Sequence, residues 1–157
     1  MNLGAPLRIG IISDTHGLLR PEVLEFFAEV DHILHAGDVG DIAILHKLSE
    51  IAPVTAVRGN TDSSPECRKL PLCDTLRLAS AEIFLHHGHM DEFNFLPHGT
   101  NVSVSGHSHA PLVRWQGTVL FINPGSAGPR RFTLPVSVGI LTIYNKARSA
   151  EIIEISV

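Results

Sequence analysis

The chain has 157 residues, of which 44% are apolar and 18% charged, and its formal net charge is −4. These values suit one domain spanning 1–157 and exclude a disordered or coiled-coil protein. The negative charge gives no footprint for non-specific binding to nucleic acid or membrane. Because neither a signal peptide nor a membrane-length apolar run is evident, we expect a soluble, cytoplasmic protein with Cys67 and Cys73 as free thiols.

The first sixty residues alternate β-branched runs with helical patterns. The pattern predicts strands at 8–13, 32–36 and 53–58, a helix at 21–30, and a second helix that begins after Asp41. Pro21 suits a first helical turn and Asp41 an N-cap. Helical spacing predicts that one face of the first helix is buried, namely Val23, Phe26, Phe27 and Val30. Such alternation is typical of right-handed βαβ crossovers between parallel strands.

From about residue 75 the chain changes to successive strand candidates. They are predicted at 75–78, 82–86, 102–105, 112–116, 119–122, 137–144 and 150–155, with hairpin turns at 115–118 and 145–149. The stretch between His89 and His107 has room for one short helix, at 91–96. The predicted fold class is α/β: a two-sheet β-sandwich flanked by helices, with mixed parallel and antiparallel strands.

Metal-binding residue types recur where these predicted strands end. Taken singly, an Asp or Asn after a strand is usually a turn residue, so each signal alone is weak. Their joint order favours a catalytic site, because carboxylate oxygens and imidazoles suit a pair of ions such as manganese, iron, zinc or nickel. The candidate ligands are Asp14, His16, Asp38, Asn60, His87, His107 and His109.

The motifs Asp-x-His, Gly-Asp, Gly-Asn, His-Gly and Gly-His-x-His, followed by Asn-Pro-Gly-Ser at 123–126, resemble the calcineurin-like metallophosphoesterase superfamily and its small YfcE-type phosphodiesterase branch. The resemblance implies an αββα fold and hydrolysis of a small phosphodiester by a hydroxide that bridges two divalent metals. The expected metal is Mn²⁺, with Ni²⁺, Fe²⁺ or Zn²⁺ as alternatives.

The resemblance also implies a role for each ligand. The first metal would be held by Asp14, His16 and His109. The second would be held by Asn60, His87 and His107, with Asp38 bridging the two. Asp38, Asn60 and His107 are the predicted catalytic residues. An alternative from another class is a catalytically weak or inactive scaffold that acts through protein partners, as the retromer subunit of the same branch does, but retention of the whole ligand set favours the enzyme.

Two departures from the family pattern affect the expected chemistry. Thr61 stands where larger members carry a His thought to assist the leaving group. Since a hydroxyl is no acid near neutral pH, we expect fast cleavage of activated diesters, slow cleavage of alkyl diesters and weak activity on monoesters. His89 is an alternative proton donor. The segment from 89 to 107 is also short for the family, which predicts a more open wall beside the substrate.

The other polar residues are expected to be structural. His32, His46 and His98 have no ligand partner at a useful spacing, whereas His35 is a candidate for orienting a ligand. Arg58 and Arg130 are candidates for phosphate contacts. We expect no stable complex with nucleic acid and no membrane partner. Homo-oligomerisation and the natural substrate, among cyclic nucleotides, other small diesters and oligonucleotide ends, stay open.

Overall fold

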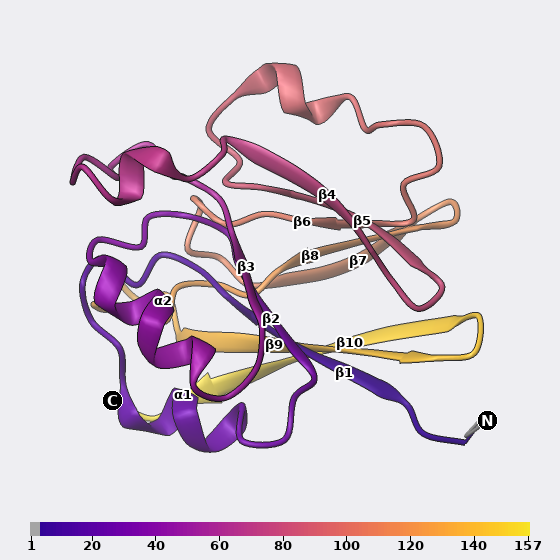
Figure 1. Cartoon of the computed structure of the whole chain (residues 1–157), viewed down its shortest axis with the longest axis horizontal. Helices are drawn as coiled ribbons and strands as arrows, with labels where there is room; N and C mark the ends of the chain where they lie inside the picture. The colour runs from indigo at the N-terminus through magenta and orange to yellow at the C-terminus, as the bar shows by residue number, and fades with distance from the viewer. Residues whose placement is uncertain (1–3) are drawn as a thin grey trace.

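The structure is a computed structural model that describes residues 4–157, folded as two five-stranded sheets packed face to face (Figure 1). The first sheet has the order β10-β9-β1-β2-β3. Its strands are β1 (Leu7–Ile12), β2 (His32–His35), β3 (Val54–Ala56), β9 (Val136–Tyr144) and β10 (Ala147–Ile155). The second sheet has the order β4-β5-β6-β8-β7. Its strands are β4 (Cys73–Leu78), β5 (Ala81–His86), β6 (Val102–Val104), β7 (Leu112–Gln116) and β8 (Val119–Asn123).

Each sheet has a parallel centre and antiparallel strands at its margin. In the first sheet β1, β2 and β3 are parallel, and β9 and β10 add antiparallel strands beside β1. In the second sheet β5, β6 and β8 are parallel, with β4 and β7 antiparallel at the edges. The predicted α/β class, with two sheets of mixed direction, is confirmed.

The apolar residues form two layers. One fills the space between the sheets with residues such as Ile9, Ile11, Leu34, Ile83 and Leu85. The other lies on the opposite face of the first sheet, where α1 (Pro21–Phe26) and α2 (Ile42–Ser49) pack their apolar sides. Burial of apolar surface in both layers is the main source of stability. These layers fix the relative position of the strand ends that carry the site.

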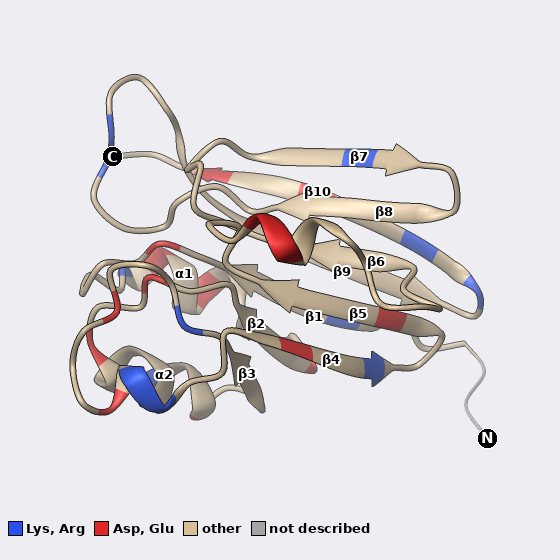
Figure 2. Cartoon of the chain, turned by 90° about the horizontal axis from the view of Figure 1, so that it is seen from above, with Lys and Arg blue, Asp and Glu red and all other residues tan. Residues whose placement is uncertain are grey.

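The outer face of the second sheet has a much lighter cover. The 3₁₀ helix η2 (Asp91–Asn94) lies over this face, as the view from above in Figure 2 shows. The other 3₁₀ helix, η1 (Cys67–Lys69), precedes β4. Figure 2 also shows basic and acidic residues spread over the chain rather than gathered in one patch. No helix within residues 4–157 is long and apolar enough to cross a membrane.

The predicted helix at 21–30 was too long. It ends at Phe26, and the chain continues in tight turns in which Val30 N donates to Phe27 O at 3.2 Å. Gly10 explains the geometry, because the Phe27 ring occupies the space where a side chain at Gly10 would lie. With Phe27 turned toward β1, Phe26 is 38% exposed, so its predicted burial was wrong.

Two further predictions differ at their edges. The short helix expected at 91–96 is the 3₁₀ turn η2, and η1 was not foreseen. The last hairpin turn is tighter than predicted, since β10 begins at Ala147 and pairs it with Tyr144. Asn145 makes this possible by adopting a φ of 54°. Cys67 and Cys73 are free thiols, as expected.

Candidate metal centre

The candidate ligands all lie just after strands at one edge of the sandwich. Asp14 and His16 follow β1, Asp38 follows β2, and Asn60 follows β3. His87 comes directly after β5, and His107 and His109 follow β6. Because these strands are parallel within each sheet, their carboxyl ends meet on the side of Figure 1 opposite the N-terminus. The sandwich therefore gathers residues from 14 to 109 into one place.

Backbone hydrogen bonds join the loops that carry these residues. Asp14 N donates to Gly37 O at 3.0 Å, and His16 N donates to Asp38 O at 2.9 Å. Gly106 N donates to His87 O at 2.8 Å, which joins the β5 and β6 ends. The loops are thus held to one another independently of the candidate ligand side chains.

The backbone of the site is strained. Among residues 4–157 eight non-glycine residues have positive φ, and five of them are candidate ligands: Asp14, His16, Asp38, His107 and His109. Such conformations cost about 1–3 kcal/mol each and persist where surrounding structure enforces them. This concentration of strain is typical of a functional site.

Two motif glycines are required by close packing against the carboxylates. A Cβ on Gly59 would overlap the Asp38 side chain, and one on Gly106 would overlap Ser13 Oγ. That Cβ on Gly106 would also lie 2.7 Å from Asp14 Oδ2. The glycines of the Gly-Asn and Gly-His-x-His motifs therefore let the backbone approach the two acids.

Asp14, His16 and His109 form the first potential metal-binding group. Asp14 is fully buried, and its Oδ1 lies 3.3 Å from His109 Nε2 and 3.7 Å from His16 Nε2. The other carboxylate oxygen, Oδ2, accepts hydrogen bonds from Ser13 Oγ at 2.6 Å and from His107 N at 3.0 Å. One oxygen of Asp14 is thus fixed by the protein while the other faces the imidazoles.

Asp14, Asp38 and His87 form the second group. His87 Nδ1 lies 2.8 Å from Ala36 O, to which it donates, so in the neutral ring Nε2 carries the lone pair. Nε2 lies 3.2 Å from Asp38 Oδ2 and 3.8 Å from Asp14 Oδ1. Asp38 Oδ2 is also 3.7 Å from His16 Nε2, which places this oxygen between His16 and His87.

Asn60 and His107 lie beside these groups at the solvent-exposed side. His107 Nδ1 is 3.1 Å from Asn60 Oδ1, and the His107 ring lies 5.1 Å from the His87 ring, centroid to centroid. Both residues are exposed, unlike the two acids. His107 is outside the two three-residue groups, and Asp14 is common to both. The division of ligands between two metals therefore stays a prediction.

The buried polar atoms fit a bound cation. Asp14 Oδ1, His16 Nε2 and His87 Nε2 are buried and make no hydrogen bond within the described residues. A buried polar atom without a partner costs about 1–3 kcal/mol. Carboxylate oxygen and imidazole nitrogen are ligands for divalent transition metals, so the residues present fit such an ion.

Opposed effects set the pKa values of the central acid and imidazole. Burial raises the pKa of Asp38, but the approach of His87 and the hydrogen bond from the Thr61 backbone outweigh it, so the pKa is lowered. Burial lowers the pKa of His87, but the approach of Asp38 and the charge of Asp14 outweigh it, so the pKa is raised. The lowered pKa of Asp38 favours its ionised form, the form that binds a metal ion.

His35 links the loop after β1 to the loop after β2. Gly37 N donates to His35 Nδ1 at 3.1 Å, so His35 Nε2 carries the hydrogen and donates to Thr15 Oγ1 at 3.0 Å. Thr15 Oγ1 in turn donates to Val39 O at 2.8 Å. Burial lowers the pKa of His35 to about 3, which keeps the ring neutral. The sequence suggested that His35 orients a ligand, and the structure shows that it contacts the loops on which the ligands stand.

Two further supporting residues were not identified from sequence. Asp62 accepts from Gly59 N at 2.8 Å and from Gly40 N at 3.0 Å, which joins the β2 and β3 loops. Asn123 Nδ2 donates to Gly106 O and to Ser108 Oγ, both at 3.0 Å. An Asp three residues after Gly59 and the Asn of Asn-Pro-Gly-Ser were the available signals, because such side chains commonly bond nearby loops.

The remaining candidates separate by location. His46 and His98 are exposed away from the cluster, and His32 Nε2 lies 2.9 Å from Thr55 Oγ1. Arg58 lines a polar pocket beside Asn60, together with Arg68 and His89. The candidate Arg130 lines a pocket formed by the chain end, including Pro135, Glu154 and Val157. Burial lowers the pKa of His109, and the charge of Arg131, not that of Arg130, adds to this lowering.

Comparison with known families agrees with this geometry. The calcineurin-like phosphoesterase superfamily domain matches residues 7–146, so the chain belongs to that superfamily and is a phosphoesterase. A Methanothermobacter thermautotrophicus protein named "Probable metallophosphoesterase" is 37% identical over 158 residues, 92% of this chain and 91% of that protein. Phosphodiesterase YfcE of Escherichia coli K12 is 31% identical over 86% of this chain and 87% of its own length. The resemblance read from the motifs is confirmed.

Solved structures agree on the fold. The structure of an archaeal phosphodiesterase matches with a TM-score of 0.79 and 24% sequence identity. The match covers 94% of this chain and 100% of the phosphodiesterase. Vacuolar Protein Sorting 29 of Cryptosporidium parvum has a TM-score of 0.75 and 19% identity, covering 96% and 98%. At these identities the likeness shows the fold alone. The alternative of a non-catalytic scaffold is thus supported only by a shared fold.

Proposed function

We propose that the chain hydrolyses phosphodiesters with two divalent metal ions bound at the strand ends. The observation that carries the proposal is the convergence of unpartnered buried atoms, Asp14 Oδ1, His16 Nε2 and His87 Nε2, in a phosphoesterase of this superfamily. When bound, two such ions polarise phosphoryl oxygens and supply a nucleophile from water at neutral pH.

Each candidate ligand has a place in this proposal. Asp14, His16 and His109 would hold one ion, as their grouping supports. His87, Asn60 and His107 would hold the other, with the Asp38 carboxylate shared between the two. The mixed oxygen and nitrogen set suits Mn²⁺, our first choice, and also Ni²⁺, Fe²⁺ and Zn²⁺.

The exposed members of the set are the groups placed to meet substrate. Asn60 and His107 are exposed while Asp14 and Asp38 are buried, so we assign phosphoryl contact to Asn60 and His107. Arg58 and Arg68 line the adjoining pocket of about 550 Å³ and bring positive charge to the same side. A guanidinium is suited to anionic phosphate oxygens.

The leaving group receives little help from Thr61. Thr61 is exposed, and its backbone N–H donates to Asp38 Oδ1 at 2.9 Å. Its contribution is therefore to hold the Asp38 carboxylate rather than to supply a proton. His89 supplies a further imidazole beside the candidate ligands, with its ring centroid 6.2 Å from that of His107. We propose that good leaving groups are favoured and that His89 is the candidate donor for the others.

The direct test is hydrolysis by metal-loaded protein. Purified chain stripped by chelator and reloaded with Mn²⁺ should cleave bis(p-nitrophenyl) phosphate faster than p-nitrophenyl phosphate. The stripped protein should be inactive. Absence of diester cleavage with all four candidate metals, in protein that retains its fold by circular dichroism, would contradict the proposal.

The cytoplasmic location stays a prediction that cell fractionation would test.

A further inference from the structure

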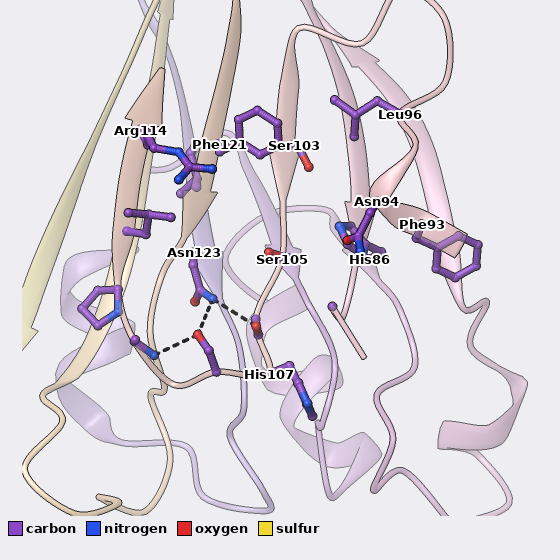
Figure 3. A pocket seen from close by; sticks show the side chains of 17 residues that line it. His86, Phe93, Asn94, Leu96, Ser103, Ser105, His107, Arg114, Phe121 and Asn123 are labelled. Atoms are coloured by element: carbon purple, nitrogen blue, oxygen red, sulfur yellow. Dashed lines mark hydrogen bonds between the residues drawn. The ribbon is translucent and has the colours of Figure 1, made fainter. Parts of the chain in front are cut away.

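A pocket of about 490 Å³ opens on the outer face of the second sheet, next to the candidate metal centre (Figure 3). Its walls come from β6, β7 and β8 and from the segment that carries η2. Ligand pockets commonly measure about 300–1,000 Å³, so the space suits one substituent of a small substrate. It is separate from the polar pocket that Arg58 and Arg68 line.

The pocket exists because this face of the sheet is thinly covered. Alternation along β6 sends Val102 and Val104 into the core between the sheets and leaves Ser103 on the outer face. Ser103 is small, and η2 with its four residues is too short to fill the face above it. A recess therefore remains between Ser103, the η2 segment and β7.

The lining combines small polar residues, such as Ser103 and Ser105, with apolar and aromatic ones, and it has one positive end. Phe93 and Leu96 border it from the η2 segment, and Phe121 borders it from β8. The Arg114 guanidinium lies 5.8 Å from the centroid of the Phe121 ring, and Figure 3 shows the two side by side. None of the described residues that line the pocket is acidic. This lining favours a planar aromatic group and disfavours a cation.

One buried polar atom also lies in this wall. His86 is 6% exposed, and its Nδ1 makes no hydrogen bond within the described residues. The His86 ring stacks on Phe84 at 5.1 Å and meets the Phe93 ring edge-on at 6.1 Å. The ring is thus held in place by its aromatic neighbours.

The pocket is continuous with the proposed active site. His107, a candidate ligand that lies 3.1 Å from Asn60, is also part of the pocket lining. Figure 3 shows His107 at one end of the pocket and Arg114 at the other. Asn123 fixes the floor between them through its bonds to Gly106 O and Ser108 Oγ. A substrate whose phosphate lies at the metals can therefore extend an ester group past His107 into the pocket.

We propose that this pocket binds an aromatic ester group of the phosphodiester substrate. The inference rests on the proposed function, because the phosphate must lie at the metal centre for the group to reach the pocket. It names the substrate class: diesters that carry at least one ring, an aryl group or a nucleobase, are bound better than dialkyl diesters. The selectivity comes from Phe93, Phe121 and Arg114.

The experiment compares the binding of diphenyl phosphate and dimethyl phosphate to the Zn²⁺-loaded protein by ligand-observed NMR. Phe121→Ala removes one aromatic wall, Ser105→Phe fills the pocket, and Arg114→Gln removes the positive end. Each variant should weaken the binding of diphenyl phosphate by about threefold to tenfold, the effect of losing one aromatic or cation–π contact. The affinity for dimethyl phosphate should change by less than about twofold, because this ligand does not reach the pocket.

Arg148→Gln is the matched control, since Arg148 makes a similar contact with Trp115 at 5.3 Å outside the pocket. It should change neither affinity. Thermal melting and metal content verify that every variant is folded and loaded. If the protein cleaves bis(p-nitrophenyl) phosphate but all three pocket variants bind diphenyl phosphate as wild type does, the pocket proposal alone fails. If the protein neither cleaves nor binds any diester, the proposed function fails and the pocket proposal with it.

Discussion

Seven of the eight non-glycine residues with positive φ among residues 4–157 lie in two regions, the hairpin turns and the candidate metal centre, for different reasons. Ala79 between β4 and β5 and Asn145 between β9 and β10 adopt a φ of 54°, and both are exposed turn residues. A tight hairpin turn explains them completely. Asp14 and Asp38 have a similar φ, 56° and 55°, but they are buried among atoms of the metal cluster.

This difference distinguishes backbone strain that only closes a turn from backbone strain at a functional site. At the hairpins the backbone conformation closes a turn between two antiparallel strands. At the metal centre Asp14 Oδ1 lies near the Nε2 atoms of His16 and His87, and all three atoms are buried without a hydrogen bond within the described residues. A cation at that point accounts for both the strain and the unpartnered atoms.

The largest expected effect is the loss of the shared carboxylate. Asp38→Asn should lower turnover of bis(p-nitrophenyl) phosphate by about 100-fold or more, because both metal positions lose a charged ligand that supports them. Steady-state kinetics and the metal content of the purified variant measure the effect. Asn145→Gly, at the hairpin, and His46→Gln, at an exposed helix position, should leave turnover unchanged. Normal turnover by Asp38→Asn would refute the assignment of Asp38.

The next effect should come from a residue that supports the loops. His35→Gln removes the bonds to Thr15 and Gly37, so metal affinity should fall about tenfold to 100-fold. Titration of chelator-stripped protein with Zn²⁺ measures the affinity. His32→Gln is the matched control, since His32 lies on the same strand and contacts Thr55 away from the cluster. Equal losses in the two variants would show a general effect on β2 instead.

A smaller effect should follow from adding a proton donor. Thr61→His should raise the rate on diesters with poor leaving groups by about tenfold or more, and on p-nitrophenyl diesters much less. The slope of log kcat against leaving-group pKa measures this and should become shallower. If the wild-type slope is already flat, the His89→Ala variant and its pH profile tell whether His89 supplies the proton. A flat slope that persists in His89→Ala would contradict the argument from Thr61.

The last expected effect concerns the pH dependence of stability rather than activity. The pKa of His35 is lowered by burial from its ordinary value of 6.5 to about 3, so below pH 6.5 the unfolded chain binds a proton that the folded chain excludes. Stability from this residue is therefore complete above pH 6.5 and is lost as the pH falls toward 3, by about 1.4 kcal/mol per pH unit within that window. Between pH 6.5 and 3, the free energy of unfolding in urea should fall more steeply with decreasing pH for metal-free wild type than for His35→Gln. Parallel curves would show that His35 is not buried as a neutral ring.

Much of the fold and the site follows from the sequence because the same local pattern recurs along the chain. Each ligand stands after an apolar run, and parallel strands bring their carboxyl ends together, so Asp14, Asp38 and His87 were predictable as a cluster. The end of α1 was not predictable, because it depends on Phe27 packing over Gly10 from a different strand. The roles of His35 and Asp62 were likewise hidden, since they bond to backbone atoms of loops distant in sequence. The aromatic pocket depends on how η2 lies over the second sheet, which a short segment without periodicity does not reveal.

The central claim is that the strand ends hold two metal ions, and metal stoichiometry tests it most directly. Wild-type protein is stripped of metal, reloaded with Mn²⁺ and freed of excess ions. Elemental mass spectrometry should then find two ions per chain. His107→Ala should retain about one, because it removes an assigned ligand of the second ion and spares the group of Asp14, His16 and His109. Wild-type protein that binds no more than one ion per chain at saturation would contradict the account.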